Sequence, residues 1–140
     1  MKEATCIGTR WFEEVWNQRR TDTIYELLAP HSVAHSSGRD LHGPEQMEQM
    51  QREVLQAVPD LKVTVDAVVT TPTDCIVRWT FCGTAGAAGV PHESCPVHYH
   101  GSTWFRVEGG KIVEGWDYWD KTAFVQDLQK VTSIPETLVA

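Results

Sequence analysis

The stretch EGGKIVEGWDYWD, residues 108–120, decides how this chain is interpreted. Gly109 and Gly110 form a two-residue turn of the kind that joins antiparallel strands, and the run after them predicts a strand from Lys111 to Trp119. This strand ends among large aromatic rings and two carboxylates. A carboxylate that is buried beside aromatic surface has a raised pKa and can act as an acid or base near neutral pH. The stretch therefore predicts a hairpin and an acid/base residue, Asp117.

Earlier strands are predicted by apolar residues that alternate with polar ones, a period of two. The small residues 83–89 predict a loop between the second and third of them. The predicted strands cover residues 61–67, 76–82 and 97–108.

Residues 5–58 show mainly helical spacing, and Gly43-Pro44 opens a helix with proline in its first turn. Residues 31–43 are expected to be irregular. Asp120 is expected to cap a terminal helix. Helices followed by an antiparallel sheet form an α+β pattern, and a strongly curved sheet around its helices would leave a one-ended pocket. The predicted helices cover residues 5–18, 23–28, 43–58 and 122–131.

The composition narrows the class of protein. With 140 residues, a single domain over residues 1–140 is expected. The net charge of −7 argues against nucleic acid and against an anionic membrane as partners. No apolar stretch has the length that crosses a bilayer, and the first residues lack the apolar core of a secretion signal. We therefore expect a cytoplasmic protein.

Several segments, in this order and spacing, resemble the SnoaL-like polyketide cyclases of the nuclear-transport-factor-like superfamily, which also contains the ketosteroid isomerases. The resemblance implies a cone-shaped α+β domain, in which a curved antiparallel sheet wraps around the N-terminal helices. It also implies a homodimer through the open sheet face, and neither a cofactor nor a metal. The segments that carry it are Trp16-Asn17, Leu41-His42-Gly43-Pro44, Val58-Pro59-Asp60-Leu61, Val77–Thr84, Gly89-Val90-Pro91 and Phe105–Glu114.

The resemblance places the family's catalytic aspartate at Asp117. Other positions depart from the relatives. Trp116 stands where the superfamily's epoxide hydrolases keep an arginine, which argues against epoxide opening. Thr103 and Ala85 stand where cyclases often keep histidine. Phe12 stands where ketosteroid isomerases keep an oxyanion-binding tyrosine, which argues against that isomerisation.

The alternation along the hairpin predicts which residues face Asp117. Thr103 and Tyr99 share its face, and we expect both to hydrogen-bond a developing oxyanion. His35 occupies the place where ketosteroid isomerases keep their general base, and its ordinary pKa suits assistance to Asp117. Aromatic residues are expected to line the pocket and bind the substrate. These are Phe12, Trp16, Trp79, Phe81 and Trp119.

A second cluster offers metal ligands: His92, Cys95, His98 and His100. On a strand His98 and His100 point the same way, as a metal site would require. That face is opposite to the face of Asp117, so an outer or subunit-contact surface is favoured over a metal site. His98, His100 and Trp104 are accordingly the candidate dimer contacts.

The leading prediction is a cofactor-independent cyclase or isomerase. It would act on a polyketide- or terpenoid-like intermediate, a small apolar or polycyclic substrate, by acid/base catalysis at Asp117. Two alternatives stay open. One is hydrolysis of an epoxide or lactone by a water activated at Asp117. The other is a module that binds a ligand or dimerises without catalysis.

Overall fold

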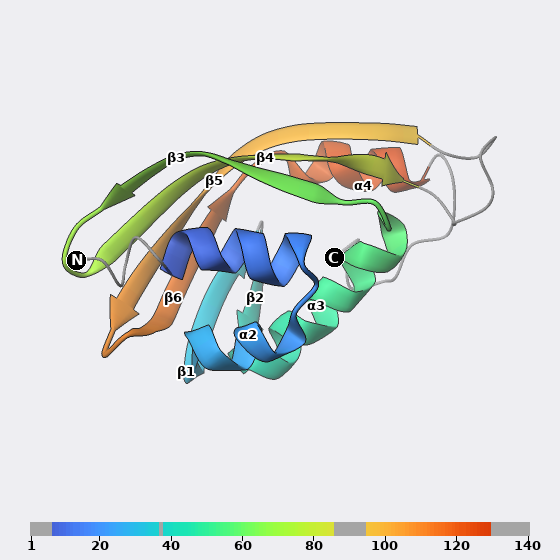
Figure 1. The fold of residues 1–140 in the computed structure, drawn as a ribbon. Coiled ribbons are helices and arrows are strands. Elements are labelled where there is room, and N and C mark those ends of the chain that lie inside the picture. Colours follow the sequence, from blue (N-terminus) through green and yellow to red (C-terminus); the bar gives the residue numbers. More distant parts are fainter. Residues whose placement is uncertain (1–6, 37, 86–94, 130–140) are drawn as a thin grey trace.

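A computed structural model gives the fold and describes residues 7–36, 38–85 and 95–129. The described elements form one six-stranded sheet with helices against its concave side; Figure 1 shows the sheet curving around the dark blue helix η1. Strand order is β2-β1-β6-β5-β4-β3. The elements are η1 (Trp11–Asn17), α2 (Thr21–Leu27), β1 (Leu28–Ser36), β2 (Arg39–His42), α3 (Gly43–Ala57), β3 (Lys62–Thr70), β4 (Asp74–Ala85), β5 (Cys95–Glu108), β6 (Lys111–Tyr118) and α4 (Lys121–Gln129).

The predicted hairpin is confirmed. Gly109 and Gly110 have φ angles of 58° and 76°, and a type I′ turn needs positive φ at both positions. From the turn, Glu108 pairs with Lys111. A bulge between Arg106 and Val107 then shifts the register by one residue, and this shift places Thr103 directly opposite Asp117. The face shared by these two residues points toward the helices. The hairpin therefore delivers the predicted carboxylate to the inside of the sheet.

The prediction that residues 31–43 are irregular is wrong. Within this range residues 31–36 form the end of β1 and residues 39–42 form β2, and β1 pairs in parallel with β6. The sheet is therefore mixed, whereas an antiparallel sheet was expected. Proline, histidine and serine in β1 hide the alternation that marks a strand, and pairing with β6 overrides this weak local preference. This error matters because β1 borders the carboxylate.

Helices are confirmed where they were predicted, with shifted ends. Residues 7–10 are already α-helical, and the chain then widens into the π-helix η1, which buries Trp11, Phe12, Val15 and Trp16. The predicted cap of α4 is present, since the Ala123 amide donates to Asp120 Oδ1 at 3.0 Å. The predicted loop at residues 83–89 is wrong for residues 83–85, which belong to β4, and residues 86–89 lie outside the described residues.

Asn17 fixes the end of η1 against the edge strand β3. Its side-chain amide donates to the Val63 carbonyl and its side-chain carbonyl accepts from the Val63 amide, each at 2.8 Å. The side chain thus imitates a neighbouring strand where β3 has none. This contact sets how η1 crosses the sheet, and with it the position of Trp16 beneath β3.

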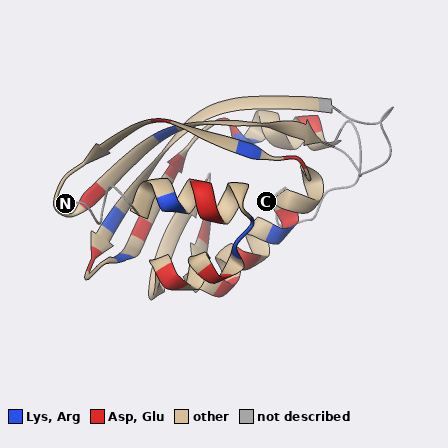
Figure 2. Cartoon of the chain, viewed as in Figure 1, with Lys and Arg blue, Asp and Glu red and all other residues tan. Residues whose placement is uncertain are grey.

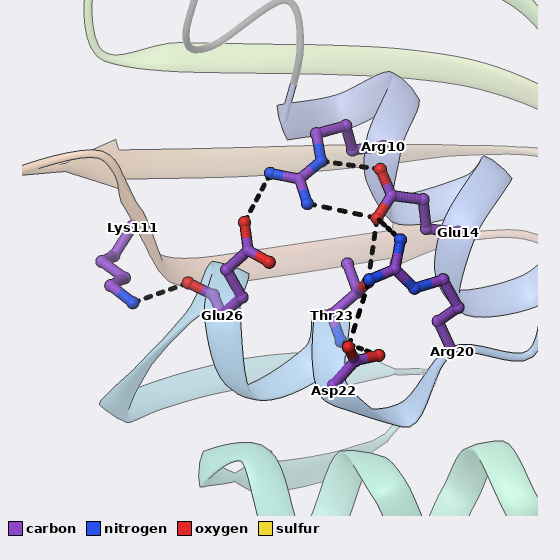
Figure 3. A network of polar contacts seen from close by, with 7 residues as sticks. All are labelled: Arg10, Glu14, Arg20, Asp22, Thr23, Glu26 and Lys111. Atoms are coloured by element: carbon purple, nitrogen blue, oxygen red, sulfur yellow. Dashed lines mark hydrogen bonds and ion pairs between the residues drawn. The ribbon is translucent and has the colours of Figure 1, made fainter.

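A network of charges joins the start of η1 to α2 and to the hairpin (Figure 3). Arg10 donates to Glu14 at 2.7 Å and to Glu26 at 2.8 Å, and Lys111 donates to the Glu26 carbonyl at 2.6 Å. The hydrogen bond from Arg10, followed by one from Thr23, lowers the pKa of Glu14 against the effect of burial. Exposed pairs of this kind stabilise a fold only modestly. They join the helices to the start of β6, at Lys111.

Among the residues that the structure describes, no helix combines the length and apolar character that spanning a membrane requires. Helices α2 and α3 contain several acidic residues, which are coloured red in Figure 2.

Candidate active site

A cavity of about 100 Å³ lies between the helices and the inner face of the sheet. Its walls are mostly apolar, and they come from η1, α3, α4 and the strands. The predicted substrate-binding residues Phe12, Trp16, Trp79, Phe81, Thr103 and Trp119 all line it. Their position inside the fold is therefore as expected, and contact with a substrate stays a prediction.

Asp117 lies on β6 and lines this cavity. Two consecutive hydrogen bonds, from Trp79 to Thr103 and from Thr103 to Asp117, hold its carboxylate. The Trp79 indole nitrogen lies 2.9 Å from Thr103 Oγ1, which lies 2.6 Å from Asp117 Oδ1. An indole N–H can only donate, so the Thr103 oxygen accepts from it. The single Thr103 proton is then left to donate to Asp117. These two hydrogen bonds hold the carboxylate in one orientation.

Ser36 is the residue that the sequence analysis missed. It pairs with Asp117 across the parallel β1–β6 ladder, lines the cavity, and hydrogen-bonds the carboxylate with its buried hydroxyl. The sequence analysis pointed to this part of the chain only through His35, the residue before Ser36. Since the strand itself was not recognised, the alternation that would have selected Ser36 was not available.

The environment of Asp117 favours its protonated form. The residue is half-buried, and loss of water around the carboxylate raises its pKa above the ordinary aspartate value. Hydrogen bonds from Thr103 and Ser36, and then the positive charge of Lys121, oppose this effect without cancelling it. A carboxylate with a raised pKa is a stronger base when ionised and a usable acid when protonated.

The structure does not bring His35 to Asp117. His35 pairs with Trp116, so alternation turns it to the opposite face of the sheet. Its Nδ1 lies 2.8 Å from Asp40 and its Nε2 2.7 Å from Glu114, and its ring stacks on Trp116. The prediction erred by one residue, which in a strand reverses the face. His35 ties together β1, β2 and β6 from outside.

His35 should make stability depend on pH. Hydrogen bonds to Glu114 first, and to Asp40 second, raise its pKa above the ordinary value of about 6.5. Because the folded pKa is the higher one, the stabilisation is complete below the unfolded pKa and is lost as pH rises through the folded pKa.

We expect His35→Phe, which keeps the ring over Trp116, to unfold at lower urea than the parent at pH 5.5 and at nearly the same urea at pH 9. The partners are half exposed, so the difference at pH 5.5 should not exceed about 1 kcal/mol. An equal loss at both pH values would contradict a role for the charge.

Tyr99 does not reach the carboxylate either. Its hydroxyl donates to Asp127 on α4, and its ring packs edge-on against Phe81 and Trp119. It is not among the described residues that line the cavity. Tyr99 therefore supports the aromatic wall from behind, and its contact with an oxyanion stays a prediction.

The metal alternative finds no support in the described part of the chain, where no three potential ligands cluster. His98 and His100 are exposed on the outer face with ring centroids 4.9 Å apart, and Thr80 is 3.0 Å from His100 Nδ1. His92 and the side chain of Cys95 lie outside the described residues.

A family model for the SnoaL-like polyketide cyclases matches residues 8–128. The chain belongs to this family. No curated protein sequence matches this SnoaL-like chain significantly. The α+β cone expected from the resemblance is confirmed, although the parallel β1–β6 pair was not expected.

Solved structures share the fold of this SnoaL-like protein. One, assigned as a SnoaL-like polyketide cyclase from Jannaschia sp. CCS1, is 21% identical with a TM-score of 0.78, covering 96% of this chain and 94% of that one. AclR, assigned as a hydroxylase from Streptomyces galilaeus, is 21% identical with a TM-score of 0.74 over 99% and 88%. IdmH, assigned as a polyketide cyclase from Streptomyces antibioticus, is 24% identical with a TM-score of 0.75 over 90% and 98%.

Proposed function

We propose that the protein is a cofactor-independent cyclase or isomerase, and that Asp117 moves the proton. The observation that carries the proposal is the contrast between Asp117 and its surroundings. Among the described residues that line the apolar cavity, Asp117 alone has an ionisable side chain. Burial has raised its pKa toward the range that suits acid/base work.

The reaction that suits this site is enolisation followed by bond formation. The Asp117 carboxylate takes a proton from a carbon next to a ketone, and the electron pair of that C–H bond forms an enolate. The enolate carbon then attacks a second carbonyl and closes the ring. Protonated Asp117 returns its proton to the resulting alkoxide, so that the balance needs no further reactant. The same proton returned to another carbon gives an isomer.

The hydrogen bonds of Thr103 support a different role from the predicted contact with an oxyanion. Its only proton is directed to Asp117 and its oxygen already accepts from Trp79, so it is not free to donate to an oxyanion. We propose that it positions the carboxylate. The aromatic walls exclude water and hold the reacting carbons close to each other.

The size of the cavity narrows the substrate class. Its volume of about 100 Å³ is smaller than, but of the same order as, the roughly 150 Å³ of a protein cavity that accepts benzene. We propose that a single ring, or the reacting part of a larger chain, occupies it. A polycyclic substrate would extend beyond these walls.

The first half of this reaction is testable without the natural substrate. We expect the protein to catalyse exchange of the α-protons of cyclohexanone for deuterium in D₂O, followed by NMR. His35→Phe, altered on the outer face, is the matched control and should exchange at the parent rate. Exchange no faster than in buffer would contradict the proposal and favour a module that binds a ligand without catalysis.

We also propose that the outer face of the sheet forms a homodimer. The support is a group of exposed aromatic and imidazole side chains, in which Trp104 is 41% and Tyr118 60% exposed beside His98 and His100.

Light scattering should therefore give twice the 15.8 kDa of one chain, and Trp104→Arg should give a single chain with an unchanged far-UV spectrum. A parent protein with the mass of one chain would contradict the dimer.

A further inference from the structure

A smaller hollow of about 30 Å³ adjoins the cavity and differs from it in charge. Most of its lining residues, Ser36 among them, belong to the main cavity as well. The two that do not are Arg39 and Lys121. An apolar chamber with one acid thus continues into a hollow bordered by two basic side chains.

The fold brings these two residues together from distant parts of the chain. Arg39 begins β2 and Lys121 begins α4, and both are half-buried. The two positive charges influence one another. Burial first, and then the charge of Arg39, lowers the pKa of Lys121, while Asp117 acts in the opposite direction. The pair stands out in a chain whose net charge is −7.

The positive charge of Lys121 is poorly compensated by neighbouring groups. Within the described residues its ammonium takes part in no hydrogen bond or ion pair. The negative charge that raises its pKa is that of Asp117, and this effect is smaller than that of burial. It also stands in the first turn of α4, where the helix dipole disfavours a positive charge. A half-desolvated cation in this position gains most from a bound anion.

We infer that the hollow is a subsite for a carboxylate of the substrate, held by Lys121 with Arg39 beside it, while the substrate's ring lies in the main cavity. This inference rests on the proposed function and extends it to the substrate class, an oxo-carboxylic acid of single-ring size. Anchoring the carboxylate at one end fixes which carbon of the ring faces Asp117.

The test measures binding and needs no turnover. Calorimetry compares cyclohexanecarboxylate with cyclohexanecarboxamide, a neutral ligand of the same shape. We expect the parent to bind the carboxylate at least about tenfold more tightly than the amide, as charged hydrogen bonds imply. Lys121→Met should remove most of that preference, whereas Lys121→Arg should keep it. Lys62→Met, a cation removed from the exposed edge strand, is the matched control and should change nothing.

Asp117→Asn separates the two proposals. It removes a negative charge near the hollow, so the variant should bind the carboxylate at least as tightly as the parent while its exchange activity is lost. No carboxylate preference in the parent, or an equal preference in folded Lys121→Met, overturns the subsite even if exchange proceeds. If the carboxylate preference depends on Lys121 but the parent catalyses no proton exchange, the subsite stands and the catalytic proposal is overturned. Should Lys121→Met not fold, Arg39→Gln must weaken the preference instead.

Discussion

Asp117→Asn should lower the rate of α-proton exchange by about 10²–10⁴-fold, the usual contribution of a positioned acid or base. Asparagine keeps the shape of the side chain and still accepts the hydrogen bond from Thr103, but it cannot take a proton. The loss should appear in kcat, because the substituted group acts on the reacting carbon and not on the remote parts of the ligand.

The same variant should be more stable than the parent at neutral pH. Burial raises the pKa of Asp117 in the folded state, so folding favours the protonated acid. The favourable contribution is complete below the unfolded pKa and is lost as pH rises through the folded pKa. Asparagine resembles the protonated form at every pH. Urea unfolding should therefore show a gain at pH 7 that disappears at low pH.

A folded Asp117→Asn protein that keeps exchange within a few-fold of the parent rate would end the catalytic assignment. A loss of both exchange and stability would indicate damage to the fold, and circular dichroism of the variant distinguishes that case. The expected combination, a slower and more stable protein, is the signature of a functional group kept at a cost to stability.

Thr103→Val should disturb the site in two measurable ways. It leaves the buried Trp79 N–H without its acceptor, which should cost about 1–3 kcal/mol of folding free energy. It also removes a hydrogen bond that lowers the pKa of Asp117, so that pKa should rise further. The ionised base then appears at higher pH, and the acidic limb of the exchange profile should move in that direction.

Thr103→Ser is the control for this prediction, because it retains the hydroxyl. Its profile should coincide with that of the parent, and its midpoint of urea unfolding should fall less than that of the valine variant. If valine leaves the acidic limb unchanged, the hydrogen bond to Asp117 has no influence on the base. If serine, which retains the hydroxyl, shifts the limb as far as valine does, the hydrogen bond from position 103 is not what sets the pKa of Asp117.

Local sequence patterns predicted the parts of the site that lie on well-marked elements. The Gly109-Gly110 turn and the alternation beyond it predicted that Thr103 faces Asp117, and the structure has that pairing. The rings of Phe12 and Trp79 also lie where the pattern placed them. The turn starts the register, but the bulge between Arg106 and Val107 was not predicted, and without it Thr103 would pair with Trp116. The facing of Thr103 and Asp117 therefore depends on a feature of the ladder that the local pattern does not show.

The other side of the site could not be predicted in this way. β1 carries proline and histidine and becomes a strand by pairing in parallel with β6, a partner more than seventy positions later. Nothing local distinguishes Ser36, which faces the carboxylate, from His35, which faces away. Local sequence also does not predict that Lys121 and Arg39 lie at the same hollow, because one begins α4 and the other begins β2.

The amino-acid sequence by itself determined the hairpin, the helices and the acid at position 117, because turns, caps and short periods act over a few neighbouring residues. Only the tertiary structure decided what surrounds that acid: the indole-to-threonine chain, the serine on β1 and the two cations beyond it. Contacts between distant segments arise from packing of the whole chain, and the raised pKa of Asp117 is a property of that packing.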